Sequence, residues 1–155
     1  MTEAVAKIQI EPEDRFSRLR LITWWNQETI AAARVLVVGA GALGNEILKN
    51  LALVGFRDVV VLDLDNIEIS NLSRSILFSE SDIGRAKATV AAASMQRILP
   101  GSRAVGLRAN VVSGIGLGVF DWADVVIGGL DNREARLWLN RACWRMNRSF
   151  IDGAI

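Results

Sequence analysis

Histidine is absent from the 155 residues, and cysteine occurs once, at Cys143. Without histidine, a Ser/His/Asp triad, an imidazole general base and a histidine metal ligand are all excluded. A single cysteine forms no internal disulfide and builds no zinc site of paired cysteines within the chain. A metal site in this chain must therefore use oxygen ligands, which favour ions such as Mg²⁺.

Long apolar runs and a surplus of one charge are also missing. No apolar run reaches the roughly 18 residues that a membrane span needs, so no membrane segment is expected. Residues 1–16 carry several acids and lack the apolar core of a secretory signal, which makes a cytoplasmic protein the default expectation. Eighteen Lys and Arg residues face 17 Asp and Glu residues. This near-neutral balance argues against general nucleic-acid binding.

Short apolar runs alternate with helical patterns along most of the chain. Strands are predicted at residues 34–38, 58–62, 103–109, 123–127 and 149–152. Helices are predicted at 42–54, 84–99 and 132–146, with a short helix or turn at 114–121. This alternation predicts an α/β fold, a doubly wound, Rossmann-like parallel sheet with helices on both faces. Ligands of such sheets bind at the carboxyl ends of the strands.

The N-terminal part of the chain differs from this core. Residues 1–13 are polar and mixed and are interpreted as a flexible arm, so the predicted core spans residues 14–155. Residues 14–33 are expected to be helical in parts, with a break near Asn26. Residues 64–82 are interpreted as a polar stretch too rich in Asn and Ser to form a core element.

A glycine motif follows the first predicted strand. Gly39, Gly41 and Gly44 fit the pattern G-x-G-x-x-G between a strand and a helix, which is the context that indicates phosphate binding. The start of the helix supplies unpaired N–H groups and partial positive charge. Asp63 ends the second strand, where a carboxylate commonly binds ribose hydroxyls. These features indicate a nucleotide, and they fit a nicotinamide or flavin enzyme equally well.

Further polar residues follow Asp63. A triphosphate carries about twice the charge of a dinucleotide's pyrophosphate, so it needs cations beyond a helix N-terminus. Arg74 offers a planar fork for phosphate oxygens, Lys87 offers a mobile point charge, and Asn71 offers neutral hydrogen bonds. Taken singly, Arg74 and Lys87 are better explained as solvated surface charges.

Asp131 follows the fourth predicted strand and has two interpretations. A carboxylate at this edge suits Mg²⁺, which bridges substrate phosphates and keeps several waters. Asp is also a favoured N-cap, and a helix is predicted to begin at Asn132. The position alone favours the cap.

Four segments together carry a family resemblance. They are, in order, VVGAGALGNEILKNLALVG, VLDLDNIEISNLSRSILF, DIGRAKA and GLDNREARLWLN. Their order and spacing resemble the ThiF/MoeB/ubiquitin-activating superfamily over nearly all of residues 15–155. The resemblance implies a phosphate loop at Gly39, Gly41 and Gly44, ribose binding by Asp63, ATP phosphate contacts by Asn71, Arg74 and Lys87, and Mg²⁺ coordination by Asp131.

A further arginine is implied near the N-terminus. The segment Arg15-Phe-Ser-Arg18 is similar to a family motif whose second arginine reaches the triphosphate from a partner subunit. The resemblance therefore assigns this role to Arg18, with Arg15 as the alternative, and implies a homodimer.

The implied function is ATP-dependent adenylation of a carboxylate with release of pyrophosphate. The acceptor expected from the resemblance is the C-terminal glycine of a ubiquitin-like or sulfur-carrier protein. Three alternatives stay open: an NAD(P)- or FAD-binding oxidoreductase, a tRNA-modifying ThiF-like dehydratase, and a non-catalytic partner subunit.

Some family features are not found in the sequence. Cys143 shares a predicted helix face with Leu139 and Met146, so we expect a buried small hydrophobe rather than an acyl-accepting thiol. The family's zinc-binding cysteine pairs are missing. Family members continue beyond a strand like that at 149–152, so we expect a core without its C-terminal part. The tryptophans are expected either in the core or at a subunit interface.

Overall fold

The structure is a computed structural model that describes residues 13–153. The strands are β1 (Arg34–Val38), β2 (Asp58–Asp63), β3 (Val105–Arg108), β4 (Val125–Gly128) and β5 (Ser149–Asp152). The α-helices are α1 (Gln27–Ala32), α2 (Ala42–Val54), α3 (Lys87–Ile98), α4 (Gly118–Trp122) and α5 (Arg133–Arg145). Short 3-10 turns are η1 (Leu19–Leu21), η2 (Ile69–Asn71) and η3 (Glu80–Asp82). Apart from Glu13, the predicted N-terminal arm lies outside the described residues.

The five strands form one parallel sheet in the order β3-β2-β1-β4-β5. Val35 of β1 pairs with Val59 of β2 on one side and with Val125 of β4 on the other. From β1 the chain first winds outward to β2 and β3 and then returns to β4 and β5. The doubly wound Rossmann-like prediction is thus confirmed, and the direction of winding changes between β1 and β4, where ligands of such sheets bind.

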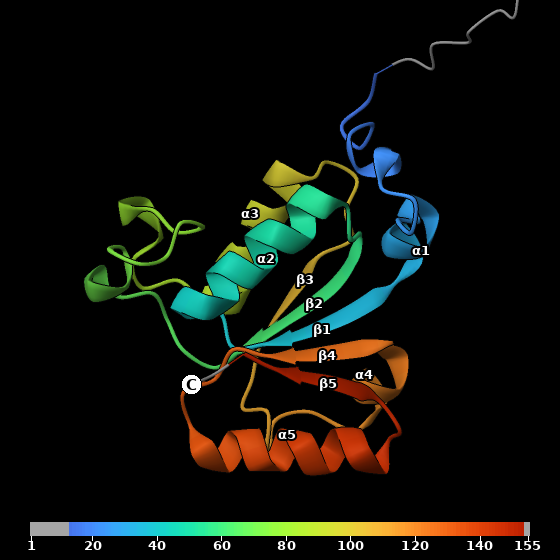
Figure 1. Cartoon of the computed structure of the whole chain (residues 1–155). Coiled ribbons are helices and arrows are strands. Elements are labelled where there is room, and N and C mark those ends of the chain that lie inside the picture. The colour runs from blue at the N-terminus through green and yellow to red at the C-terminus, as the bar shows by residue number, and fades with distance from the viewer. Residues whose placement is uncertain (1–12, 154–155) are drawn as a thin grey trace, which may run out of the picture.

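Helices cover both faces of the sheet. Helices α2 and α3 lie on one face and α5 lies on the other, together with the short α4 (Figure 1). The central strand β1 is buried on both faces: Val35 and Val37 pack towards α2 and α3, while Leu36 and Val38 pack towards α4 and α5. This explains why β1 is a continuous apolar run rather than an alternating one.

Helix α3 packs closely against the outer strand β3. A Cβ atom at Gly106 would lie 2.3 Å from the carbonyl oxygen of Ala88, in the first turn of α3. Only glycine at position 106 leaves room for this helix backbone, and the alanine-rich sequence of α3 suits the same close approach. The pair fixes the start of α3 relative to the sheet.

The predicted start of this helix at Gly84 was wrong by three residues. The backbone N–H of Gly84 donates to Ile67 and that of Ile67 donates to Arg85, at 2.8 Å each. Asn66 and Ala86 also form an antiparallel bridge. These residues are paired as a short ribbon and cannot enter the helix, which begins at Lys87. The short helix or turn predicted at 114–121 forms a helix only from Gly118, four residues later. The bounds of the remaining elements differ by at most two residues, as is usual for helix and strand ends.

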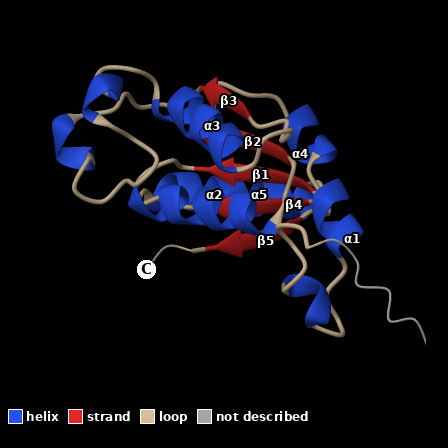
Figure 2. Ribbon diagram, turned by 90° about the horizontal axis from the view of Figure 1, so that it is seen from above, coloured by secondary structure: helices blue, strands red, loops and turns tan. Residues whose placement is uncertain are grey.

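Residues 64–86 form a long connection between β2 and α3 that extends beyond the carboxyl ends of the strands (Figure 2). As predicted, it contains no strand and no α-helix, only the turns η2 and η3. Although it forms no core element, this connection contributes side chains to the core. Ile67, Leu77 and Phe78 are buried in the cluster beneath α2 and α3, so this connection is anchored from below.

The N-terminal segment confirms the predicted break at Asn26. The side chain of Asn26 accepts a hydrogen bond from the backbone N–H of Thr29 at 2.9 Å and so caps α1. The turn η1 lies before this break. Among residues 13–153, no helix is long and apolar enough to cross a membrane.

Candidate nucleotide site

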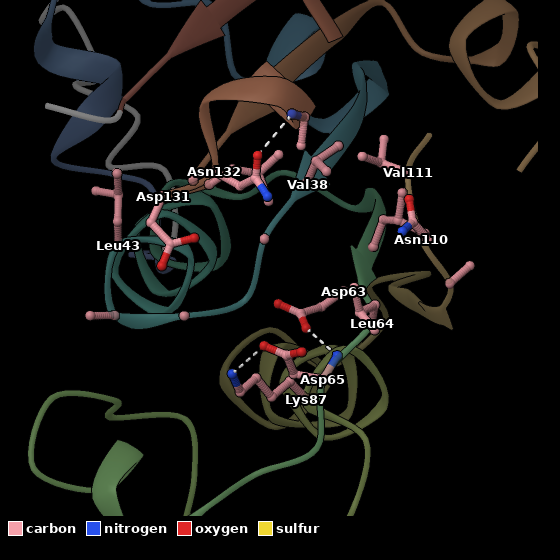
Figure 3. Close-up of a pocket in the computed structure, with 18 of the residues that line it drawn as sticks. Val38, Leu43, Asp63, Leu64, Asp65, Lys87, Asn110, Val111, Asp131 and Asn132 are labelled. Atoms are coloured by element: carbon pink, nitrogen blue, oxygen red, sulfur yellow. Dashed lines mark hydrogen bonds and ion pairs between the residues drawn. The ribbon is translucent and has the colours of Figure 1, made fainter. Parts of the chain in front are cut away.

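A cavity of about 940 Å³ lies at the carboxyl edge of the sheet. Its lining comes from the segments that follow β1, β2, β3 and β4 (Figure 3). Seven of the predicted site residues line it: Gly39, Gly41, Asp63, Asn71, Arg74, Lys87 and Asp131. The predicted residues Gly44 and Arg18 do not line it. The structure therefore brings together residues that are spread over more than ninety positions of the sequence.

The glycine loop is shaped by close backbone contacts. Gly39 has φ +97°, and a Cβ atom there would lie 2.7 Å from the carbonyl oxygen of Gly129. Gly44 does not line the cavity because it lies beneath the loop, where a Cβ atom would meet the Gly39 carbonyl oxygen at 2.0 Å. A Cβ atom built at Gly41 would meet no atom within 4 Å, and Gly41 is the N-cap of α2 with no side-chain cap hydrogen bond. The start of α2 therefore offers backbone N–H groups to an anion.

Asn45 holds this loop in place and was missed in the sequence. It is fully buried. Its Nδ2 donates to the carbonyl oxygens of Ala40 (2.8 Å) and Gly41 (3.0 Å), and its Oδ1 accepts from the N–H of Leu77 (2.9 Å). The signal was an amide one turn before Leu48, on the apolar face of α2. Through Asn45 the phosphate loop and the 64–86 connection form one unit.

Asp63 stands between the glycine loop and the end of β2. Its Oδ2 accepts a hydrogen bond from the Ala40 N–H at 2.7 Å, and its Oδ1 accepts one from the Asp65 N–H at 2.8 Å. A carboxylate oxygen has more than one acceptor site, so both oxygens can also accept hydroxyl donors. The position matches the ribose-binding role expected for Asp63.

Three donors reach the cavity from the 64–86 connection and the start of α3. Lys87 forms an ion pair with Asp65 at 3.0 Å. The Arg74 guanidinium is exposed and donates to the Ser70 carbonyl oxygen at 2.7 Å. Asn71 is buried, and its Oδ1 accepts from the Glu68 N–H at 3.0 Å. Two cations and an amide thus lie on one side of the cavity.

Asp131 is not the cap of α5, contrary to the interpretation favoured by its position alone. The cap is Asn132, whose Oδ1 accepts from the N–H groups of Glu134 (2.8 Å) and Ala135 (3.2 Å). The Asp131 carboxylate is exposed and accepts no hydrogen bond from residues 13–153. In Figure 3 the Asp131 carboxylate lies above Lys87, on a different segment of the chain.

Oxygen ligands for Mg²⁺ fit this arrangement. Within the described residues, no cluster of three or more acids or cysteines could enclose a metal ion. Mg²⁺ bound to a nucleotide needs only one or two protein carboxylates, because phosphate oxygens and waters complete its octahedron. The Asp131 carboxylate, with no structural bond to lose, is suited to that role.

The loop after β3 forms a further wall that was missed in the sequence. Asn110, Val111 and Val112 line the cavity, and Asn110 Oδ1 accepts the Val112 N–H at 2.8 Å. With Val38 and Leu64 these residues give the cavity an apolar side, which is the environment that a nucleotide base requires. Weak strand patterning at 103–109 gave no reason to expect a site there.

Arg18 lies away from this cavity. It precedes η1, and neighbouring Phe16 packs against Gly55 at the far end of α2. Neither Arg18 nor Arg15 lines the cavity of its own chain.

Comparison with known proteins agrees with this geometry. The model of the ThiF family matches residues 14–155. The chain belongs to the ThiF family. The family resemblance seen in the sequence is thereby confirmed.

Named relatives of this ThiF chain are ubiquitin-like-protein activating enzymes. It is 44% identical over 128 residues to a NEDD8-activating enzyme E1 catalytic subunit of Caenorhabditis elegans, covering 83% of this chain and 30% of the relative. It is 40% identical to the SUMO-activating enzyme subunit uba-2 of the same organism, covering 81% of this chain and 22% of the relative. The chain thus spans less than a third of either relative.

Solved structures show the same fold. Escherichia coli MccB with AMPCPP and MccA superposes with a TM-score of 0.78 at 25% identity, covering 92% of this chain and 45% of that one. MccB with succinimide gives a TM-score of 0.79 over the same shares.

The single thiol of this ThiF chain lies on the face of α5 that packs against the sheet. Cys143 packs with Leu139 and is 1% exposed. Burial raises the pKa of the Cys143 thiol to about 11. A protonated, enclosed thiol is a poor nucleophile, which confirms its interpretation as a small hydrophobe.

Proposed function

We propose that this chain binds ATP in the cavity at the carboxyl edge and is the adenylating part of an enzyme that activates a carboxylate. The observation that carries the proposal is the convergence of three groups on one cavity: the glycine loop, the Asp63 carboxylate, and the donors Asn71, Arg74 and Lys87. In the sequence, Arg74 and Lys87 taken singly were better explained as surface charges. Their location in one cavity with the glycine loop and Asp63 is what that explanation does not account for.

Charge supports ATP over a dinucleotide. A helix N-terminus largely satisfies a pyrophosphate. The additional cations Arg74 and Lys87 come from a segment outside the glycine loop, and they match the additional charge of a triphosphate. Bound NAD or FAD would offer Arg74 and Lys87 no additional phosphate to neutralise.

The proposed reaction requires no general base. A carboxylate with a pKa of about 3.5 is ionised at neutral pH. One of its oxygens attacks the α-phosphorus of ATP, the bond to the bridging oxygen of the β-phosphate breaks, and pyrophosphate leaves with that electron pair. Arg74 and Lys87 orient the triphosphate and stabilise its charge, which is the main contribution a protein makes to such transfers. The lack of histidine is therefore no obstacle.

Asp131 would hold Mg²⁺, which supplies further neutralisation of the phosphates when bound. The side chain's contribution is an exposed carboxylate on the cavity wall, in the segment that follows β4. Asn132 keeps this carboxylate available by capping α5 in its place.

The proposed acceptor is the C-terminal glycine of a ubiquitin-like or sulfur-carrier protein. Relatives named for NEDD8 and SUMO support this class, and MccB, solved with MccA, supports a peptide acceptor in the same fold. A ThiF-like tRNA dehydratase is the other acceptor class, since a modified base also offers a carboxylate.

A homodimer and a cytoplasmic location stay predictions. Arg18 does not line the cavity of its own chain. In the proposed dimer it therefore acts on the other subunit, where it reaches the bound triphosphate. The exposed side chains Leu21 and Trp24 in the same segment support an interface there.

Calorimetric titration tests the nucleotide. The purified chain is titrated with Mg²⁺-ATP, Mg²⁺-free ATP and NAD⁺. We expect ATP to bind most tightly with Mg²⁺, and Arg74→Ala to weaken ATP binding about tenfold or more, because a charge-assisted contact is lost. Arg103→Ala, which removes an arginine outside the cavity, is the matched control and is expected to leave ATP affinity unchanged. Preference for NAD⁺ over ATP would overturn the proposal in favour of an oxidoreductase.

A further inference from the structure

Asp65 lies in the cavity but has no part in the proposed nucleotide contacts. Its side chain is 59% exposed, and its Oδ2 lies 3.0 Å from the Nζ of Lys87. Its backbone carbonyl oxygen also accepts the Lys87 N–H at 3.0 Å. Lys87 is therefore held twice by the same residue, once at its backbone and once at its ammonium group; Figure 3 shows the contact at the ammonium group.

Asp65 is itself attached to the ribose-binding carboxylate. Its N–H donates to Asp63 Oδ1, and Asp63 Oδ2 accepts the Ala40 N–H of the glycine loop. A continuous series of short hydrogen bonds thus runs from the phosphate loop to the ammonium of Lys87. No group in this series is free to move without breaking one of these bonds.

The exposure of the two side chains shows which one is being held. The Lys87 side chain is only 12% exposed, whereas that of Asp65 faces water over more than half of its surface. A lysine stem has four rotatable bonds, and ordering it on ligand binding costs conformational entropy. The ion pair orders Lys87 before any ligand arrives.

We propose that Asp65 is a positioning residue, which holds the Lys87 ammonium towards the β- and γ-phosphates and links that cation to the ribose site through Asp63. The inference rests on the proposed function, because it takes ATP as the ligand. Asp65 acts on the nucleotide through Lys87 and contributes little to folding, since a partly exposed ion pair is screened by water.

Nucleotide affinity in a double-mutant cycle tests this role. ATP and AMP are titrated into the wild type, Asp65→Ala, Lys87→Met and the double variant. In Asp65→Ala both backbone bonds remain, so the fold is retained and the unfolding midpoint checks it. We expect ATP affinity to fall about fivefold, the upper range for an ion pair of this exposure. AMP affinity is expected to stay within about twofold, because AMP lacks the phosphates that Lys87 serves.

The cycle distinguishes positioning of Lys87 from an independent contact with ATP and from repulsion of ATP by the carboxylate. In the Lys87→Met background, Asp65→Ala is expected to have no further effect on ATP affinity. An additive effect, an equal loss for ATP and AMP, or a gain in ATP affinity from reduced repulsion would each overturn the proposal. If the wild type binds no ATP, the proposed function fails, and the labelling experiment below still decides the role of Asp65.

Lysine labelling tests the positioning without any nucleotide. The chain has three lysines, Lys7, Lys49 and Lys87, so each modified peptide is readily assigned. An amine-reactive acetylating reagent is applied and the rate at each lysine is followed by mass spectrometry. Asp65→Ala is expected to raise the rate at Lys87 alone, and Asp65→Asn, which keeps an acceptor, is expected to raise it less.

Glu46→Ala is the matched control. Glu46 forms an ion pair with Lys49 on α2, outside the cavity. Its removal is expected to affect labelling of Lys49 alone and to leave ATP affinity unchanged. An unchanged rate at Lys87 in Asp65→Ala would show that the carboxylate does not hold the ammonium, and would overturn the proposal.

Discussion

The two ends of the parallel sheet use arginines and aspartates differently. At the amino ends of the strands, arginines pair with aspartates of a neighbouring strand, its flanking residue or the helix α4. The pairs are Arg34 with Asp124, Arg103 with Asp58, and Arg148 with Asp121. At the carboxyl ends, Lys87 pairs with Asp65 and Arg136 pairs with Asp152, but Arg74 and Asp131 have no ion-pair partner among residues 13–153. Charges that are paired within the chain join its strands, whereas charges left unpaired beside a cavity are available to a charged ligand.

Backbone packing differs between the ends as well. The carboxyl end depends on glycines that let the loop after β1 pass against the loop after β4. At the amino end, side chains join the strands, as when the Arg34 guanidinium bridges to the Asp124 carboxylate at 2.7 Å. Substitutions at the two ends should therefore produce effects of different kind as well as different size.

Gly44→Ala is expected to have the largest effect. The new methyl group would overlap the Gly39 carbonyl oxygen, which is backbone and cannot rotate away. We expect a loss of about 3 kcal/mol or more in the free energy of unfolding, together with loss of ATP binding. Urea denaturation and calorimetry measure the two effects. A stable variant that still binds ATP would show that the loop after β1 is more adaptable than its packing indicates.

Asp131→Asn is expected to act on ligand binding alone. The carboxylate has no structural bond in the described part of the chain, so the unfolding free energy should stay unchanged. ATP affinity in the presence of Mg²⁺ should fall about tenfold, and affinity in its absence should hardly change. Calorimetry with and without Mg²⁺ measures the difference. Equal losses in both conditions would contradict a role in holding the metal ion.

Asp124→Asn is expected to have the smallest effect, a slight loss of stability that shows above about pH 4 and disappears in acid, where the wild type loses the same contribution. The hydrogen bonds from Arg34 lower the pKa of Asp124 to about 2, from an ordinary value of 3.8. A lowered pKa in the folded state contributes stability that is complete above about pH 4 and is lost as the pH falls towards 2. Because both side chains are well exposed, this contribution is less than about 1 kcal/mol.

Thermal unfolding between pH 2 and pH 7 measures this prediction. The wild type should lose more stability than Asp124→Asn between pH 4 and pH 2, and ATP affinity at pH 7 should be the same for both. A change in ATP affinity would show that the two ends of the sheet are coupled.

The sequence predicted the central part of the fold well. The apolar run within Arg34–Val38 marks a buried strand, and its predicted bounds are confirmed. The bounds predicted for the more polar strand Ser149–Asp152 are confirmed as well. The start of α3 was misplaced because Gly84 looks like a helix boundary. In the structure Gly84 pairs with Ile67, 17 positions earlier, and this pairing keeps it out of the helix. A local pattern contains no information on such a partner.

The candidate site shows the same limit. Motif spacing located Asp63, Arg74 and Lys87 at the edge where the cavity lies. It did not find Asn45, which works from beneath the loop, because a buried amide resembles any polar helix residue until its three partners are known. For Asp131, the cap and the metal ligand became distinguishable only when Asn132 was seen to cap the helix.

The tight contact between Gly106 and Ala88 connects the outer strand β3 to the cavity, although no residue of β3 lines the cavity. Ala88 is the neighbour of Lys87, so a side chain at position 106 would push the start of α3 and carry the ammonium group with it. Because a helix moves nearly as a rigid rod, a displaced first turn would shift Lys87 relative to the cavity. In the proposed function, sequence changes on the outer strand would therefore alter nucleotide affinity without touching the nucleotide.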